Sequence, residues 1–434
     1  MIMTRKASLF CALIGALVIS SCERDNFADE TQDYKNVKVL QLSPELTAIR
    51  NYVPENAVFA HRGSTFWVPE ETEAAFRWAR NIGADYIEAD LQITKDGVIL
   101  ALHDYELKRT SDIENIFPDR EFLPASSFTY EELMQLDAGT WFNDARPEQA
   151  RASFSTQKQY ISTLEDMIMI AQGMRIKRDP VTQERIYSKV TNADGTVKYT
   201  FEYEPDPMDN GHRPGIYIET KEPWVNPGIE AALYTELDRL GWNILTQPEP
   251  NNNQFYTDTD GSQKVNVGNT NGKVILQTFS LESLRLLNGI FAGKVPTCFL
   301  LWLGNGPTDM PNDDPRTYAE FINFGIENNA VFMGPSIAGA PNKYPELLKP
   351  WQSELMHKSG VAIHAYSFDT REQMGQYYGE YFYNNTGENI PNRPLVDGMF
   401  TNRAEMTLNF YKEKGVRPIG AAGTALEVLI NLGY

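Results

Sequence analysis

Short apolar runs alternate with longer amphipathic stretches along most of this 434-residue chain. Eight runs are five to eight residues long and rich in β-branched and aromatic residues, which predicts buried strands. The eight predicted strands span residues 57–62, 86–92, 216–221, 274–279, 297–303, 330–336, 361–368 and 397–401.

Stretches with helical periodicity separate most of these strands. They include residues 71–81, 164–172, 226–240, 281–291 and 345–358. Eight strands that alternate with helices predict an α/β fold with a closed (β/α)8 barrel, the TIM barrel. A doubly wound open sheet is the alternative, although no Gly-rich dinucleotide-binding turn follows the first strand.

The connection between the second and third predicted strands is much longer than one helix requires. After a return strand at residues 98–103, residues 105–160 are rich in aromatic residues and proline, and they predict an inserted subdomain. Residues 174–214 form a second excursion, with a long hairpin that turns at residues 192–195. Loops that follow the strands of a TIM barrel lie on the catalytic face, so we expect the insertion to lie over the rim of the active site.

A β-hairpin is predicted between the second strand and the return strand, because Asp96-Gly97 between two apolar runs is a strong turn signal. If the turn centres on these two residues, Asp90 lies opposite His103, and opposed side chains are about 5 Å apart. Glu88 shares a face with Asp90, because side chains along a strand alternate with a period of two. Two acids and one histidine therefore converge within the hairpin.

Charged residues on a hairpin usually form a solvated face, but here the intervening residues Ile87, Ala89 and Leu91 are apolar. Both strands are therefore expected to be buried on at least one side. Burying an unpaired charge costs several kcal/mol, so charges kept at such a place are commonly paired with one another or hold a metal. We interpret the cluster as a functional site.

The first residues of the chain are typical of an export signal. Arg5 and Lys6 precede an apolar core at residues 9–19, which is too short to span a bilayer. Residues 19–22 resemble a bacterial lipobox, which predicts a lipoprotein signal peptide at residues 1–22 and lipidation of Cys22; an ordinary cleaved signal is the alternative. A polar tether at residues 23–42 and a barrel domain at residues 43–434 follow. We therefore expect a protein of the bacterial cell envelope, lipid-anchored and facing the periplasm or the outer membrane.

Composition limits the partners of this chain. The formal net charge is −19, which argues against nucleic acid as a ligand because phosphate backbones demand basic patches. Cys11 leaves with the signal and Cys22 is lipidated, so Cys298 has no partner for an intrachain disulfide. A chain of this length can build its own core, and no obligate protein partner is predicted.

The candidate site residues lie at the carboxyl ends of the first three strands. Glu88, Asp90 and Glu219 offer hard oxygen ligands that suit Ca²⁺ or Mg²⁺ rather than zinc, and of the two ions we favour Ca²⁺. The two imidazoles of the region, His61 and His103, titrate near neutrality and can transfer protons. The cations Arg62 and Lys221 can hold a tetrahedral anion. Together these groups describe metal-assisted attack on phosphorus.

The sequence resembles the glycerophosphodiester phosphodiesterases, especially the periplasmic bacterial type, from about residue 57 onward. The motifs that carry the resemblance are His61-Arg62-Gly63, Pro69-Glu70-Glu71-Thr72, Glu88-x-Asp90, Asp96-Gly97, His103-Asp104, Phe117-Pro118-Asp119-Arg120, Thr163-Leu164-Glu165, Ile218-Glu219-Thr220-Lys221, Gln277-Thr278-Phe279, His364-Ala365-Tyr366 and Asp397-Gly398-Met399-Phe400-Thr401.

This resemblance implies a phosphodiesterase TIM-barrel domain at residues 43–434 that hydrolyses a glycerophosphodiester to glycerol 3-phosphate and an alcohol. It implies one divalent cation on the three acids, with His61 and His103 as the acid/base pair. Phosphate and substrate contacts are expected from Arg62, Lys221 and Tyr366. A cyclic phosphate intermediate and direct attack by water require the same residues, so both remain open.

Three positions depart from the family pattern: Glu71 stands where Asn is common, Asn402 where Asp is usual, and Tyr366 where Trp is frequent. None is expected to touch the metal ligands or the proton-transfer histidines. Two other functions remain open: a catalytically silent binding lipoprotein, and the same fold acting on another phosphodiester, as a phospholipase D-like or phosphoinositide-cleaving enzyme.

Two of the three remaining histidines are expected to lie outside the site. His212 is predicted to be a surface residue and His357 a residue at a helix end. For His364, a structural role inside the barrel and a role in the site are equally expected.

Overall fold

The computed structural model describes residues 33–304, 306, 310–380 and 393–434. The predicted signal peptide, the lipidation site Cys22 and the first ten residues of the tether lie outside the described residues. Membrane anchoring and envelope localisation therefore stay predictions. Across the described ranges, no helix combines the length and apolarity needed to cross a membrane.

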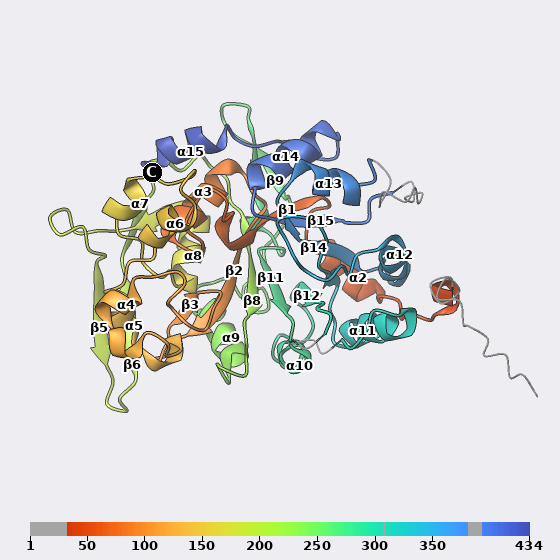
Figure 1. Cartoon of the computed structure of the whole chain (residues 1–434), viewed down its shortest axis with the longest axis horizontal. Helices are drawn as coiled ribbons and strands as arrows, with labels where there is room; N and C mark the ends of the chain where they lie inside the picture. The colour runs from red at the N-terminus through yellow and green to blue at the C-terminus, as the bar shows by residue number, and fades with distance from the viewer. Residues whose placement is uncertain (1–32, 305, 307–309, 381–392) are drawn as a thin grey trace, which may run out of the picture.

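Eight parallel strands close into a barrel (Figure 1). They are β1 (Ala57–Ala60), β2 (Tyr86–Ile93), β8 (Gly215–Thr220), β11 (Val274–Thr278), β12 (Thr297–Leu300), β13 (Phe332–Gly334), β14 (Ala362–Phe368) and β15 (Gly398–Thr401). Strand β1 pairs with β15 on one side and with β2 on the other, which closes the ring. The predicted TIM barrel is confirmed, and the open sheet is excluded.

Helices surround the barrel. They are α2 (Pro44–Arg50), α3 (Glu73–Ile82), α8 (Leu164–Ala171), α9 (Ile229–Arg239), α10 (Leu281–Ile290), α11 (Pro315–Glu327), α12 (Pro350–Ser359), α13 (Arg371–Tyr377), α14 (Ala404–Glu413) and α15 (Ala425–Leu432). Polar side chains cap several first turns: Thr72, Thr163 and Ser280 each accept a hydrogen bond from the backbone of the helix that follows. These caps fix where α3, α8 and α10 begin after their strands.

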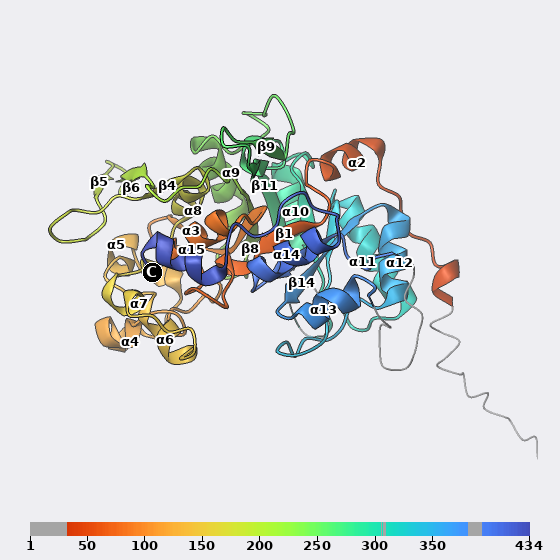
Figure 2. The same cartoon turned by 90° about the horizontal axis from the view of Figure 1, so that it is seen from above.

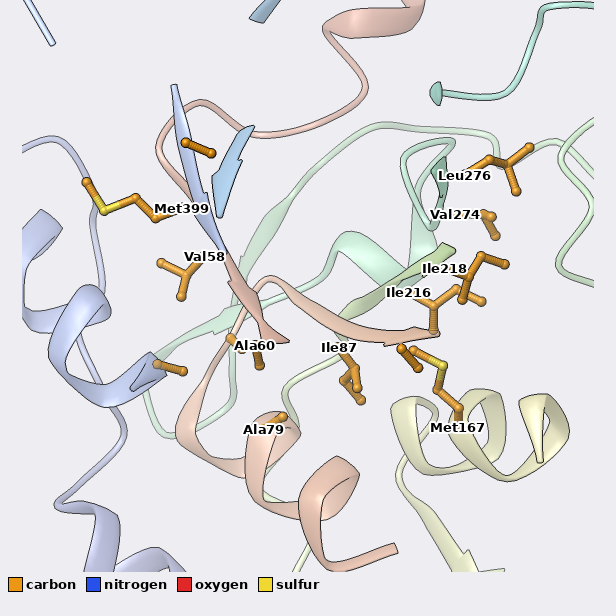
Figure 3. Packing of buried hydrophobic residues seen from close by; sticks show 14 of the residues in the cluster. Val58, Ala60, Ala79, Ile87, Met167, Ile216, Ile218, Val274, Leu276 and Met399 are labelled. Atoms are coloured by element: carbon orange, nitrogen blue, oxygen red, sulfur yellow. The ribbon is translucent and has the colours of Figure 1, made fainter. Parts of the chain in front are cut away.

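The strands alternate between two faces. Outward side chains pack against the helices, and Figure 3 shows Ile87 and Ile216 beside Met167 of α8. Inward side chains form an aromatic plug in which the rings of Phe59, Tyr217 and Phe400 lie 4.8–4.9 Å apart, centroid to centroid. Because the period is two, the next inward positions of each strand face the mouth of the barrel.

The hairpin after β2 has a different register from the predicted one. Strand β3 (Ile99–Ala101) pairs so that Leu91 lies opposite Ala101, which places Asp90 opposite Leu102 rather than His103. The loop contains three residues, with Gly97 at φ 87° and Thr94 N–H donating to Val98 O over 2.9 Å. A three-residue loop ending in a left-handed glycine shifts the pairing by one residue relative to a two-residue turn.

The insertion forms a separate layer on one side of the barrel, away from α11 and α12 (Figures 1 and 2). It contains α4 (Ile113–Ile116), α5 (Tyr130–Leu133), α6 (Thr140–Ala145) and α7 (Ser153–Thr156), with short 3₁₀ turns at Pro118–Arg120 and Ala125–Ser127. The long hairpin is β5 (Tyr187–Thr191) with β6 (Val197–Phe201), and it turns at residues 192–195 as predicted. The shorter pair β4 (Met174–Ile176) and β7 (Tyr203–Pro205) connects it to the barrel.

The insertion and the hairpin share a core of their own, which includes Phe128, Tyr130, Leu133 and Phe201. A buried ion pair connects this core to α8. Arg185 donates to both carboxylate oxygens of Asp166, over 2.8 and 3.1 Å. The insertion is therefore fixed to the barrel by side-chain contacts as well as by the chain.

Two smaller features complete the fold. The polar excursion after α9 contains β9 (Phe255–Thr257), β10 (Gln263–Val265) and a 3₁₀ turn at Val267–Asn269. The described part of the tether, with a 3₁₀ turn at Asp33–Asn36, runs along α11 and α12. Tyr34 Oη donates to Glu354 over 3.0 Å, and Leu42 N–H donates to Ser359 O over 2.9 Å.

Candidate active site

A cavity of about 460 Å³ opens at the carboxyl ends of the barrel strands. It brings together all eight residues that the sequence places in the catalytic, phosphate-binding and metal-binding roles. Its lining consists of His61, Arg62, Glu88, Asp90, His103, Arg109, Glu219, Lys221, Gln277, Phe279, Leu300, Trp302, Tyr344, Tyr366 and Phe400.

A tight 3₁₀ turn, η2 (His61–Gly63), presents the first histidine and arginine directly after β1. Arg62 and Gly63 have φ angles of 50° and 81°, in the left-handed region. A Cβ atom on Gly63 would lie 2.5 Å from Cβ of Ala75, so the turn packs directly on α3. Arg62 N–H donates to Glu88 over 2.8 Å, which ties the turn to β2.

Three carboxylates face one another across β2 and β8. Asp90 and Glu219 are register partners, and Glu88 lies two residues earlier on the same inward face. Lys221 Nζ lies 3.6 Å from Asp90 and 3.4 Å from Glu219. Arg62 Nε lies 3.3 Å from the other oxygen of Asp90. The acids and the two cations therefore form one buried charge cluster.

The protonation of these acids reflects their crowding. Burial and the neighbouring Asp90 raise the pKa of Glu88 well above its usual value. The same two causes raise the pKa of Glu219 to about 8, against the opposing effect of Lys221. Although burial would raise it, the pKa of Asp90 is held below its usual range by Lys221, His103 and Arg62. The three carboxylates thus exceed the positive charge of Arg62 and Lys221, so the cluster favours binding of a further cation.

The donors fit a hard divalent cation in chemistry, because they are three buried, mutually repelling carboxylates. Gln277 Oε1 adds a buried oxygen without a hydrogen-bond partner. Within the part of the chain that the structure describes, however, no three acidic, histidine or cysteine side chains are close enough to form a ligand shell. The two cations instead hold Asp90 and Glu219 in ion pairs.

His61 contacts an amide. Its Nδ1 lies 2.7 Å from Oδ1 of Asn402, which also accepts from Thr65, while Asn402 Nδ2 donates to Asp369 over 2.9 Å. An amide oxygen only accepts, so we assign the ring proton to Nδ1 and leave Nε2 as a base. Burial and the nearby Arg62 lower the pKa of His61 to about 3.

His103 contacts a carboxylate instead. Its Nδ1 lies 2.5 Å from Oδ1 of Asp104. Burial, Arg62 and Lys221 lower the pKa of His103, while Asp90 and Asp104 oppose that shift. Asp104 thus works toward the imidazolium form of His103, whereas the partner of His61 is an uncharged amide.

The three departures from the family pattern lie closer to the chemistry than expected. The expectation that none touches a metal ligand or a proton-transfer group was wrong. Asn402 bonds His61, and Glu71 accepts a hydrogen bond from Asp90 N–H over 2.7 Å. Tyr366 lines the cavity with its ring, because its hydroxyl donates to Leu301 O over 2.7 Å.

The other histidines are structural. His364 stacks on Phe332 with ring centroids 4.0 Å apart and bonds Tyr217 beneath the site. His357 lies in the last turn of α12, as predicted, and bonds Asp397. The surface prediction for His212 was wrong: it is 3% exposed, because its Nδ1 accepts the N–H of Val265 from the strand β10 that folds over it.

Some lining residues were not predicted as site residues. Gln277 donates to Glu88 over 2.9 Å, and its place in a family motif with the inward parity of β11 was a usable signal. Arg109 comes from the insertion, and nothing in its local sequence indicated a contact with the site. Aromatic residues also line the cavity, and these include Trp302 from the loop after β12 and Tyr344 from the loop after β13.

Comparisons with known proteins agree with this architecture. The sequence model of the Glycerophosphoryl diester phosphodiesterase family matches residues 61–233. A glycerophosphodiester phosphodiesterase of Bacillus subtilis is 29% identical over 265 residues, which cover 60% of this chain and 65% of that protein. A glycerophosphoinositol inositolphosphodiesterase of Mus musculus is 31% identical over 140 residues, which cover 31% of this chain and 26% of that protein.

The matched regions thus span less than two thirds of these relatives. A solved structure from Silicibacter pomeroyi, described as a candidate glycerophosphoryl diester phosphodiesterase, has the same fold, with a TM-score of 0.51 and 16% identity. The match covers 86% of this chain and 98% of that one. Residues 61–233 are thus similar to the Glycerophosphoryl diester phosphodiesterase family, and the chain shares the barrel fold of that solved structure.

Proposed function

We propose that this protein hydrolyses glycerophosphodiesters to glycerol 3-phosphate and an alcohol. One observation carries the proposal: two histidines, two cations and three carboxylates line a single cavity at the mouth of the barrel. Arg62 and Lys221 bind the phosphoryl oxygens, as a forked donor and a point charge. The insertion, which borders this cavity, restricts access to it.

Proton transfer falls to the two histidines. His61 Nε2 accepts a proton from the attacking oxygen, which is either the glycerol 2-hydroxyl or water. His103, whose imidazolium form Asp104 stabilises, gives a proton to the departing alcohol. If a cyclic phosphate forms, the histidines exchange roles when water opens it.

One divalent cation, Ca²⁺ rather than Mg²⁺, would be held by Glu88, Asp90 and Glu219. When bound, it would neutralise charge on the phosphoryl oxygens and relieve the repulsion among the three acids. The raised pKa values of Glu88 and Glu219 support this assignment, because they report uncompensated negative charge.

The test is release of glycerol 3-phosphate from glycerophosphocholine by the purified protein, with Ca²⁺, with Mg²⁺ and with a chelator. We expect release that the chelator abolishes and added Ca²⁺ restores. His61→Ala and His103→Ala should each lower kcat by about 10²- to 10⁴-fold. His357→Gln is the matched control, because His357 bonds Asp397 away from the cavity.

No release of product from any glycerophosphodiester would support a silent binding protein and overturn the proposal. Turnover by His103→Ala close to that of the unaltered protein would remove His103 from its role. The name of the mouse relative favours one further candidate, cleavage of glycerophosphoinositol on the other side of phosphorus. Inositol phosphate and glycerol as products of that substrate would identify this reaction.

A further inference from the structure

We propose that Arg109, which the insertion contributes, is a positioning residue for both halves of the proton-transfer and phosphate-binding apparatus. It acts on His103 through Asp104 and on Arg62 through Glu70. This inference rests on the proposed function. It gives the insertion a part in catalysis beyond controlling access.

The guanidinium of Arg109 makes three hydrogen bonds to two acids. Nη1 and Nη2 donate to the two oxygens of Glu70 over 3.0 and 2.7 Å, which is a forked, bidentate pair. Nε donates to Oδ2 of Asp104 over 2.5 Å. The planar fork of one side chain therefore sets the distance between the two carboxylates.

Each of these two acids also contacts a residue of the site. Glu70 accepts from Arg62 Nη1 over 3.3 Å, and Asp104 contacts His103 Nδ1 over 2.5 Å. The contacts form one continuous series, which runs from Arg62 through Glu70, Arg109 and Asp104 to His103. The arginine that binds phosphate and the proton donor to the leaving group are joined through the insertion.

The charges along this series explain why Arg109, at its centre, affects the residues at both ends. Although burial would raise it, Arg62 and Arg109 hold the pKa of Glu70 at about 2. Without Arg109, the buried Glu70 would have Arg62 as its main counter-charge, and would draw that guanidinium away from the phosphoryl group. Asp104 would lose the partner that fixes the orientation of its carboxylate toward His103.

The backbone around Arg109 is anchored. Leu107 is fully buried in the core of the insertion, and Ser111 Oγ donates back to Leu107 O over 2.7 Å. The Arg109 side chain itself is 43% exposed and reaches the edge of the cavity. Among the described residues that line the cavity, it is the one from residues 105–160. Residues 105–160 thus present the Arg109 guanidinium to the cavity from an anchored backbone.

The experiment compares Arg109→Gln with Lys108→Gln in the full chain. Lys108 is the matched control, because it is a neighbouring cation of similar exposure that pairs with Glu121 inside the insertion. Two substrates separate the roles: glycerophosphocholine, whose alcohol needs a proton to leave, and the 4-nitrophenyl ester of glycerol 3-phosphate, whose phenolate leaves without one. Circular dichroism and thermal unfolding check that each variant is folded.

For Arg109→Gln we expect kcat on glycerophosphocholine to fall by about 10- to 100-fold, part of the range of a general acid. On the nitrophenyl ester kcat should fall by less than about threefold, while KM rises for both substrates as Arg62 is displaced. Lys108→Gln should match the unaltered protein on both. Arg109→Lys, which keeps the charge without the fork, should recover only part of the loss.

Equal losses of kcat on the two substrates would show that Arg109 does not act through His103 and would overturn the proposal. So would an Arg109→Gln variant with unaltered kinetics. If the unaltered protein cleaves neither substrate, the proposed function fails instead, and the two failures are distinct.

Discussion

Asn402 and Asp104 give the two histidines of the site different partners. An amide oxygen faces His61 and a carboxylate faces His103. Because this partner of His61 is uncharged, burial dominates and lowers the pKa of His61 to about 3, so the ring stays neutral through the physiological range. The substitution of Asn402 for the usual acid therefore bears directly on the chemistry.

Asn402→Asp should shift the pH dependence of the proposed activity. A carboxylate 2.7 Å from Nδ1 favours the protonated ring and should raise the pKa of His61 by about 1–3 units. If His61 is the proposed base, which acts when neutral, the acidic limb of kcat/KM should move to higher pH. Profiles of kcat/KM from pH 4 to 9 measure this shift.

Thr65→Val is the control for that variant, because it removes a hydrogen bond to the same amide oxygen without adding charge. Its acidic limb should stay where it is in the unaltered protein. An Asn402→Asp profile that coincides with the unaltered one would contradict the assignment of His61 as the base.

The residues borne on strands could be predicted from the sequence, and the contacts between segments could not. Glu88, Asp90 and Glu219 follow from strand positions and a period of two. Arg109 and Asn402 reach the site from loops whose paths depend on packing across the whole chain. Local sequence does not specify such contacts, because loop geometry is set by the elements that the loop joins.

At the scale of elements, the turn η2 carries the strictest backbone requirement of the site. It holds His61 and Arg62 against α3 through a glycine that has both a left-handed φ and a close neighbour. Gly97 in the β2–β3 loop has a similar φ of 87°, but no atom lies within 4 Å of the position that a Cβ would occupy there. Comparing alanine substitutions at the two glycines therefore distinguishes the cost of a left-handed backbone from the cost of a steric clash.

Gly63→Ala should destabilise the protein by about 2–4 kcal/mol, from the left-handed backbone and from overpacking against Ala75. It should also lower kcat, because the turn must shift to relieve the clash. Gly97→Ala should cost only about 1–2 kcal/mol and leave kcat unchanged. Urea unfolding and steady-state kinetics on both variants measure the difference. Equal effects of the two variants on kcat would contradict a special role for the turn.

The elements themselves were well predicted, and the register of one hairpin was not. Strands and helices follow from periodicity and from the turn residues that bound them. The Asp96-Gly97 pair suits both a two-residue turn and the end of a three-residue loop. A difference of one residue in the loop moved His103 out of cross-strand register with Asp90, although the histidine still reaches the cavity.

At the scale of the whole molecule, three histidines lie in separate regions, two of them fully buried and His61 half-buried. They are His61 in the site, His212 under β10 and His364 inside the barrel. Burial is the largest cause that lowers the pKa of each to about 3. The unfolded chain binds these protons below about pH 6.5 and the folded chain does not, so acid favours unfolding.

The free energy of unfolding should therefore fall as the pH drops from about 6.5 toward 3. Each of the three groups contributes a slope of up to about 1.4 kcal/mol per pH unit. Between pH 7 and pH 5, the free energy of unfolding of His212→Gln should fall by about 2 kcal/mol less than that of the unaltered protein. Urea unfolding at the two pH values measures this difference, whatever the variant's stability at pH 7.

Tyr256→Phe is the control, because it alters a hydrogen bond to Gly211 beside His212 without changing proton binding in this range. Its loss between the two pH values should equal that of the unaltered protein. The same loss in His212→Gln would mean that His212 is protonated in the folded state.

The closure of the barrel by β1 and β15 has a consequence for biosynthesis. Strand β1 is synthesised first, but the edge that pairs with β15 stays unpaired until β15 has been synthesised. His61 likewise lacks its partner Asn402 until then. A nascent chain that stalls before this point carries the three carboxylates and both imidazoles of the site, yet lacks the amide that bonds His61. The proposed hydrolytic site is thus completed only near the end of translation.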